Sequence, residues 1–242
     1  KPNTLFTCPA CDATLYLSDW EIGKGDGDVM VATPTRVYTV TDQIARDDLC
    51  NVYRCAYKLD DKQRQGMFRA ARNAADNDLV KNEAQTVYHL QATTDYDDFR
   101  PFLPLILDSF LYKDASLDKA RQVNIFGLHE EINSPGELHS LQEVYDYYPN
   151  GIDPKDMAWM WRRVLYVLGF LHKQNVIHGA GLPSHIPIEP VDHKVMLTGF
   201  GFSVREPQKT GDHIKALSIT YEKWYPDEIR QKQPPTPSFD LF

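Results

Sequence analysis

The sequence predicts an α+β fold, in which a small antiparallel sheet with one helix comes first and a mostly helical half follows. Three observations lead to this expectation. Before residue 128, several short stretches alternate apolar and polar residues, which is typical of strands. One stretch with helical spacing interrupts them. After Gly127 the apolar residues repeat at steps of three or four, as in amphipathic helices.

The strands of the first part follow from the alternating pattern. Val37–Val40 and Asn51–Tyr57 are separated by a polar turn and are expected to form a β-hairpin. A third strand is expected near Gly66–Ala70. Two further strands are expected at Leu103–Tyr112 and Gln122–Leu128, after the helix. Together they make the small antiparallel sheet.

The helix of this first part begins near Asp76, and either Asp76 or Asn77 could cap its N-terminus. In the second part, a short amphipathic stretch around Leu141 is followed by a long helix opened by Asp153-Pro154, with the Asp as N-cap and the Pro at the first helical position. An apolar stripe follows along it: Met157, Met160, Trp161, Val164, Val167, Leu168 and Leu171. Such a stripe is typical of core packing rather than of a cofactor site.

Composition places the chain among ordinary globular proteins. Its 242 residues are 42% hydrophobic and 25% charged, and the net charge is −8. The acidic balance argues against a nucleic-acid or anionic-membrane surface. No apolar run approaches the roughly 18 residues that span a bilayer. Four cysteines do not make a disulfide framework, so we expect a reducing, cytoplasmic setting. Because the chain starts at Lys1 and stops at Ser238–Phe242, in what resembles the start of a helix, we expect a fragment.

Cys8-Pro9-Ala10-Cys11 stands out near the N-terminus. Two thiolates at this spacing can chelate zinc through one tight turn, but a structural site needs four ligands. Cys50 and Cys55 lie within a strand pattern and are poor candidates for the other two. A zinc-ribbon remnant with Cys8 and Cys11 as metal ligands and a pair of plain reduced thiols therefore both stay open. A redox pair is less favoured, because no helix follows the motif.

The stretch Val176–Ser203 organises the second part of the chain. It follows the long helix and is expected to form a His-containing loop, a turn, a buried strand at Val195–Thr198 and then Gly199-Phe200-Gly201. This layout resembles the catalytic and metal-binding loops of a protein kinase. With the preceding sheet and helix, residues from about 36 to 242 resemble a bilobal protein-kinase-like fold that is cut short at the C-terminus.

The resemblance assigns each kinase motif to a position in this chain, where the expected residue is often replaced. Ile44–Tyr53 occupies the place of the glycine-rich loop. The other positions are Arg69 for the third-strand lysine, Glu83 for the glutamate of the following helix, His178-Gly179-Ala180 for His-Arg-Asp, His185 for the metal-binding Asn and Gly199 for the metal-binding Asp. Two later kinase motifs also have counterparts: Pro226-Asp227-Glu228 resembles the Ala-Pro-Glu that closes the activation segment, and Asp240 resembles the aspartate that opens the next helix. The implied domains are a zinc-ribbon-like segment 1–28, an N-terminal lobe 29–128 and a partial C-terminal lobe 129–242.

These replacements remove the groups that phosphoryl transfer uses. Asp47 in the glycine-loop position would repel a polyphosphate, and Arg69 is a poor substitute for lysine. Ala180 and Gly199 carry no carboxylate, and the imidazole of His185 does not suit a hard magnesium ion. The resemblance therefore implies a pseudokinase without bound magnesium–ATP.

The histidines also have structural interpretations, in which they are hydrogen-bonding loop residues. In kinases the counterpart of His178 bonds to the backbone near the metal loop, and His185 and His193 can be explained in the same way. The segment His-Gly-x-x-Leu-Pro-x-His resembles bacterial and phage kinase-like proteins that carry an N-terminal zinc knuckle.

The expected function is that of a non-catalytic scaffold or interaction module with a protein partner, and a homo-oligomer stays open. No nucleic-acid or membrane partner is expected. The alternatives are a divergent nucleotide-binding kinase or nucleotidyl transferase of the same fold, and a small-molecule phosphotransferase. Each would need metal-binding carboxylates, for which Asp192 and Asp212 are weak candidates.

Overall fold

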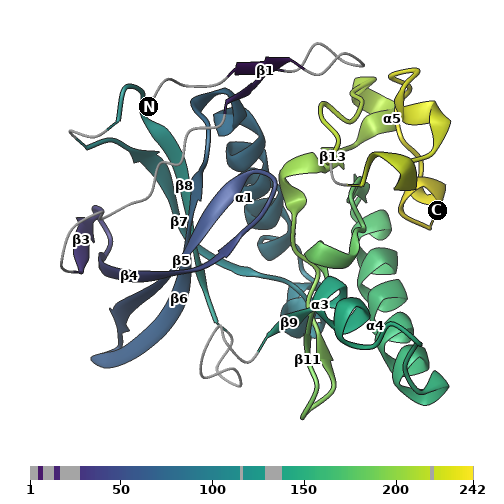
Figure 1. The fold of residues 1–242 in the computed structure, drawn as a ribbon, viewed down its shortest axis with the longest axis horizontal. Helices are drawn as coiled ribbons and strands as arrows, with labels where there is room; N and C mark the ends of the chain where they lie inside the picture. The colour runs from purple at the N-terminus through teal and green to yellow at the C-terminus, as the bar shows by residue number, and fades with distance from the viewer. Residues whose placement is uncertain are drawn as a thin grey trace.

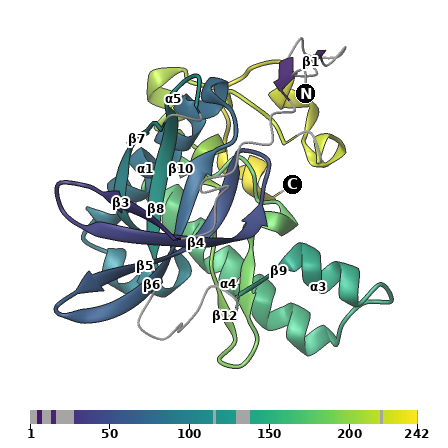
Figure 2. The same cartoon turned by 60° about the vertical axis from the view of Figure 1, so that its left-hand side comes forward.

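In the computed structural model, residues 5–7, 14–16, 28–114, 117–128, 138–218 and 221–241 are described. They form a curled antiparallel sheet with one long helix against it, beside a mostly helical half (Figures 1 and 2). Figure 1 places the sheet on the left and most helices on the right. The predicted order of sheet, helix and helical half is thus confirmed in outline.

The main sheet of the described residues has six strands in the order β3-β4-β5-β6-β8-β7, all antiparallel. Their bounds are β3 Val29–Ala32, β4 Val37–Arg46, β5 Cys50–Leu59, β6 Lys62–Ala71, β7 Leu105–Tyr112 and β8 Arg121–Gly127. Side chains alternate between the two faces along β6, so Phe68 and Ala70 are buried on one face. Arg69 projects from the other face, toward the helix that covers it. Strand β3 was not predicted.

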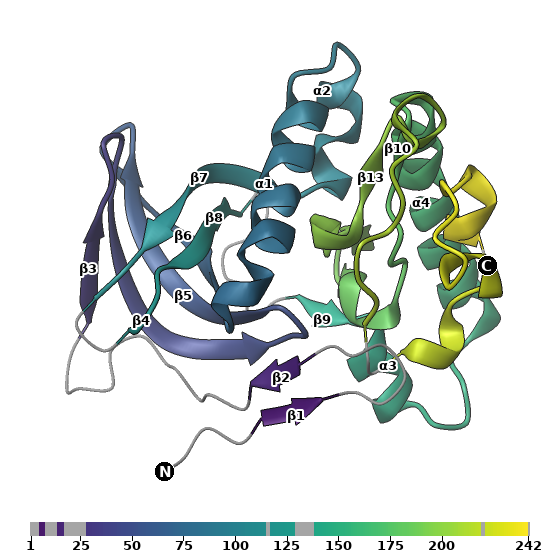
Figure 3. The same cartoon turned by 90° about the horizontal axis from the view of Figure 1, so that it is seen from above.

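The sheet curls strongly, as Figure 3 shows from above. Asp108 of β7 accepts hydrogen bonds from Tyr38 of β4 at 2.5 Å and from Thr35 of the preceding turn at 2.9 Å. These bonds join strand β7, at one edge of the sheet, to the β3–β4 hairpin at the other. An apolar core that includes Tyr53 and Phe68 fills the curled face. The sheet is therefore closed on itself by side-chain hydrogen bonds, and it surrounds an apolar core of its own.

Helix α1 (Asn77–Gln91) covers the other face of the sheet. Leu79, Val87 and Leu90 are buried at the helical spacing that the sequence showed. A single 3-10 turn, Ala74–Asp76, comes first and is capped by the side chain of Asn73. Asp76 occupies the N-cap position of α1, as one of the two predicted alternatives, but the side-chain cap bond is absent. The Asn77 side chain instead accepts from the Gln122 N–H at 2.7 Å.

The helical half contains α2 (Tyr96–Phe99), α3 (Leu141–Tyr147), α4 (Pro154–Lys173) and α5 (Pro207–Thr210). Helix α4 begins as predicted, since the Asp153 side chain accepts the Lys155 N–H at 2.7 Å. Its buried residues Val164, Val167 and Leu171 lie in a core shared with α1. This shared core holds the two halves together.

Short strands and 3-10 turns connect these helices. Strand β10 (Val176–Ile177) pairs with β13 (Val204–Arg205), and β11 (Pro187–Glu189) pairs with both β9 (His139–Ser140) and β12 (Lys194–Val195). The 3-10 turns are η2 Arg100–Phe102, η4 Pro183–His185, η5 Phe200–Phe202, η6 Glu222–Trp224, η7 Asp227–Ile229 and η8 Pro237–Leu241. Of the strand expected at Val195–Thr198, only the first residue belongs to a strand, β12. The N–H group of Met196 still donates to Pro187 of β11, but those of Leu197 and Thr198 donate to Phe102 of η2 and His185 of η4.

Near the N-terminus, β1 (Leu5–Thr7) pairs with β2 (Thr14–Tyr16) in an antiparallel hairpin. Cys8 and Cys11, the predicted metal ligands, lie outside the described residues. The zinc-ribbon-like segment and the domain boundaries stay predictions.

Candidate functional site

The candidate site lies where strand β6, helix α1 and the loop after α4 meet. Arg69 on β6 donates from Nη2 to Glu83 on α1 at 3.2 Å. The second carboxylate oxygen of Glu83 accepts from the Asn124 amide at 2.9 Å. Glu83 is only 3% exposed, so these partners replace the water that its charge has lost. Arg69 and Glu83 are therefore paired, although an arginine is a poor substitute for the lysine that the resemblance predicts at position 69.

The guanidinium of Arg69 holds a second carboxylate, that of Asp47, at 2.8 Å. Asp47 belongs to the loop of residues 46–50 that joins β4 to β5. Its other oxygen accepts the N–H groups of Leu49 at 2.9 Å and Cys50 at 2.7 Å, and its carbonyl accepts from Arg72 at 3.0 Å. Burial alone would raise the pKa of Asp47, but the Arg69 charge and these N–H donors leave it below its usual range. The loop is thus folded around an ionised carboxylate.

Leu49, at the tip of this loop, connects the two halves of the molecule. It packs against a cluster of the first half that contains Cys50 and Val80. It also packs against a cluster of the helical half that contains Ala180 and Phe202. The Leu49 side chain therefore lies between the sheet and the Val176–Ser203 stretch and contacts both.

Gly201 shows how closely Leu49 approaches this stretch. A Cβ built on Gly201 would lie 2.8 Å from a Leu49 methyl carbon, which is closer than real Cβ contacts allow. The absence of a side chain at this position is what lets the loop tip reach the segment after Gly199.

His178 is fully buried and has a structural role. Its Nε2 lies 2.8 Å from the Thr198 carbonyl, which can only accept, so Nε2 carries the proton. Its Nδ1 then accepts the Ala180 N–H at 3.3 Å. Burial lowers the pKa of His178 to about 4, with a smaller opposing effect from Asp240, so the ring is neutral. The His178 ring thus bonds to the backbone, as the structural interpretation of this histidine predicted.

Asp240, in the last 3-10 turn, supports the backbone of this loop. Its carboxylate accepts the N–H groups of His178 at 2.9 Å and Gly179 at 2.8 Å, and it lies 2.8 Å from Nε2 of His172. Ala180 is buried, and its methyl side chain has no group that could orient a hydroxyl. The loop is held in place without a reactive side chain at its centre.

His185 and Gly199 are in contact, and each explains the other. Nδ1 of His185 donates to the Ala180 carbonyl at 2.8 Å, and the ring stacks on Phe202 with centroids 5.9 Å apart. Gly199 has φ +82°, and a Cβ there would lie 2.5 Å from the His185 ring. The imidazole therefore occupies the room that a side chain at position 199 would need.

Helix α1 is tied to the segment that follows Gly199. The Asn82 amide donates to the carbonyls of Gly201 at 3.1 Å and Ser203 at 2.9 Å. The Ser203 hydroxyl donates to the Phe200 carbonyl at 2.6 Å, so it accepts from the Thr86 hydroxyl, which lies 2.9 Å away. These bonds fix α1, and with it Glu83, relative to the helical half.

The described part of the chain contains neither a cluster of metal-binding side chains nor a helix that could cross a membrane. Among those residues, no group of three or more His, Cys, Asp or Glu side chains is placed to hold a metal ion. Cys50 and Cys55 are free and buried in β5. The described helices include none with the length and apolar character needed to cross a membrane.

Sequence reasoning placed Arg69, Glu83, His178, Ala180, His185 and Gly199 in one site, and the structure brings them together. It missed three contributors. The charge pattern could have suggested that Asp47 partners Arg69, since each was recognised as an unusual residue at its position. No sequence signal indicates the insertion of Leu49 or the bond from Asn124, because both depend on tertiary contacts.

Comparison with known structures supports a kinase-like fold. No protein-family profile and no curated protein sequence matches the chain. Among solved structures, the crystal structure of the BubR1 kinase domain superimposes with a TM-score of 0.60 at 15% identity. The match covers 89% of this chain and 61% of that one, so the chain spans about three fifths of its length. At this identity the likeness concerns the fold alone.

Proposed function

We propose that this protein is a catalytically inactive kinase-like domain that acts as a protein-interaction module. One observation carries the proposal: Asp47, in the loop that corresponds to the glycine-rich loop, forms an ion pair with Arg69, which stands at the position of the third-strand lysine. The Asp47 carboxylate bonds to Arg69 at 2.8 Å, where a ligand phosphate would be expected to bind. An external anion would have to displace a carboxylate that Arg69 and two backbone N–H groups hold.

The residues at the metal positions support the same proposal. Magnesium prefers oxygen ligands in near-octahedral geometry. Gly199 supplies no side-chain atom, and Nδ1 of His185 already donates to the Ala180 carbonyl. The buried position of Ala180 lacks a base for a substrate hydroxyl. These residues do not fit magnesium–ATP, and we derive no catalytic step from the site.

The remaining bonds of the site favour a rigid structure. Asn82, Ser203 and Asp240 tie α1 and the loop after α4 into one arrangement. A domain with a fixed shape and no chemistry of its own is suited to presenting a surface to another protein. We therefore propose a protein partner and a scaffold role.

The experiment is a thermal-shift titration of the protein with ATP, with and without magnesium or manganese, beside an active protein kinase as positive control. We expect no shift for this protein under conditions that stabilise the control. Saturable, metal-dependent stabilisation at micromolar ATP would overturn the proposal. That result would favour a divergent nucleotide-binding kinase or nucleotidyl transferase instead.

A further inference from the structure

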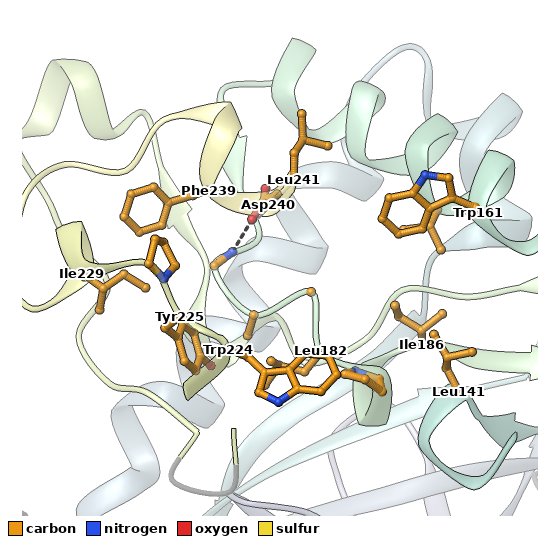
Figure 4. Close-up of a pocket in the computed structure, with 16 residues that line it drawn as sticks. Leu141, Trp161, Leu182, Ile186, Trp224, Tyr225, Ile229, Phe239, Asp240 and Leu241 are labelled. Atoms are coloured by element: carbon orange, nitrogen blue, oxygen red, sulfur yellow. Dashed lines mark hydrogen bonds between the residues drawn. The ribbon is translucent and has the colours of Figure 1, made fainter. Parts of the chain in front are cut away.

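A cavity of about 210 Å³ lies on the helical half, where residues 179–183 of the Val176–Ser203 stretch form part of its wall (Figure 4). Leu141 of α3, Trp161 of α4 and Ile186 line one side, and Tyr225, Ile229 and Phe239 line the other. Its lining is predominantly apolar. The Asp240 carboxylate at its wall already accepts two backbone N–H groups, so it is not available to a ligand. The cavity therefore suits an apolar group.

Large exposed apolar side chains line this cavity or lie on the helices that line it. Trp161 is 49% exposed and Trp224 is 58% exposed. Met157 and Leu165 lie four residues before and after Trp161, so all three form one exposed stripe along α4. Tyr145, which is 68% exposed, follows Leu141 by one turn of α3. We call the cavity and these five side chains the aromatic groove. A cavity beside exposed tryptophans has the composition of a protein-interaction hot spot.

The charges beside the aromatic groove are mostly negative. The stretch 138–153, which contains α3, carries Glu143, Asp146 and Asp153, all exposed, and no lysine or arginine. Across the cavity, segment 222–228 carries three acids and one lysine. Helix α4 adds exposed charges of both signs, Lys155, Asp156 and Arg162, and Arg230 pairs with Glu222. The balance favours a positively charged occupant.

We propose that the aromatic groove binds a basic amphipathic helix of another protein. A large apolar side chain of that helix would enter the cavity, and further apolar residues at steps of three or four would lie along the Met157–Trp161–Leu165 stripe. Lysines or arginines on its flanks would face the acids of residues 138–153 and 222–228 and the exposed Tyr145 ring. The inference rests on the proposed interaction function and names the surface and the kind of partner.

Two fluorescently labelled synthetic peptides of about 16 residues test this proposal by anisotropy. Both carry the same leucines and one tryptophan at helical spacing, with lysine at every polar position in one and glutamate in the other. We expect the lysine peptide to bind and the glutamate peptide to bind at least about tenfold more weakly. Trp224→Ala and Tyr145→Ser should each weaken binding of the lysine peptide at least about tenfold. Tyr88→Ser, an exposed tyrosine on α1, should not.

The charge arm uses Asp227→Lys combined with Glu228→Lys, compared with Asp98→Lys on α2. Only the Asp227→Lys, Glu228→Lys double variant should bind the lysine peptide more weakly and with a smaller salt dependence. Circular dichroism verifies that each variant is folded. All of the substituted side chains are exposed, so each substitution should affect stability little. If one variant nevertheless fails to fold, the others still test the proposal.

Equal binding of the two peptides, or unchanged binding by Trp224→Ala and Tyr145→Ser, would overturn the proposal. So would concentration-dependent self-association that Trp224→Ala abolishes, since the occupant would then be a second copy of this chain. The nucleotide titration is independent of these outcomes. Metal-dependent ATP binding with intact peptide binding overturns only the proposed lack of catalysis, whereas loss of peptide binding without ATP binding overturns only this inference.

Discussion

The Arg69 guanidinium bonds to the Asp47 carboxylate at 2.8 Å, closer than it lies to Glu83 at 3.2 Å. The closer partner belongs to the loop that would have to open for any ligand to reach Arg69. The ion pair thus holds the loop against strand β6, and its contribution to the free energy of unfolding can be measured.

Replacing Asp47 with alanine is expected to destabilise the protein by about 2–4 kcal/mol, because it leaves Arg69 with one carboxylate and two loop N–H groups without their acceptor. Urea unfolding of the Asp47→Ala variant and the wild type measures the difference. The matched control is Asp98→Ala, an exposed aspartate on α2, which should change stability by less than about 0.5 kcal/mol. Equal effects of the two substitutions would mean that the Arg69 pair does not hold the loop.

The contact between Asp47 and Arg69 also marks the limit of prediction from the sequence. Alternation placed five strands of the main sheet, and the Asp153-Pro154 signal placed the start of α4, because local chemistry decides both. Asp47 was considered in the sequence only for its effect on a ligand's phosphates, and the structure adds that it forms an ion pair with Arg69. Predicting this pair requires the position of the loop in space.

Other features could not be predicted for the same reason. Leu49 reaches two clusters that are far apart in the sequence, and Gly201 leaves room for it. The edge strand β3 has only four residues, Val29–Ala32, which is too short for an alternating pattern to distinguish it from a loop. The strand expected at Val195–Thr198 was predicted to be too long, because an apolar run does not reveal how far a partner strand extends.

Loop 46–50 should control access to Cys50. This thiol is fully buried, and burial raises its pKa well above the usual range, so it reacts only when the loop opens. Leu49→Ala removes packing from both clusters and should raise the rate of Cys50 alkylation about tenfold or more. Peptide mapping by mass spectrometry after iodoacetamide treatment gives the rate at each cysteine.

Cys55 is the internal control for that measurement, because it is equally buried but lies in the middle of β5. Its rate should change much less than that of Cys50. If both rates rose together, Leu49→Ala would be acting through global unfolding, and the idea of a separately opening loop would be wrong.

Stability should fall with acidification because His178 is held neutral. Its pKa is lowered to about 4 in the folded protein, below the unfolded value of about 6.5, so the unfolded chain binds more protons between these values. The contribution is complete above about pH 6.5 and is lost as the pH falls toward 4, a change of about 3 kcal/mol. Asp47, whose folded pKa is also lowered, adds a loss in the acid range.

His178→Gln separates these contributions, because an amide can donate to the Thr198 carbonyl but does not titrate. Urea unfolding at roughly pH 7 and pH 4.5 should show a smaller pH dependence in this variant than in the wild type. An undiminished pH dependence would assign the acid sensitivity to other groups.

Gly199 and His185 should behave as a coupled pair. Gly199→Ala adds a Cβ at 2.5 Å from the His185 ring and at φ +82°, where a non-glycine residue is strained by about 1–2 kcal/mol. The clash should bring the total cost above that of the backbone strain alone. In the background of His185→Ala, the clash disappears while the strain remains, so the same substitution should cost only the strain. A double-mutant cycle by urea unfolding measures the difference, and additive costs would show that the imidazole is not what excludes a side chain at position 199.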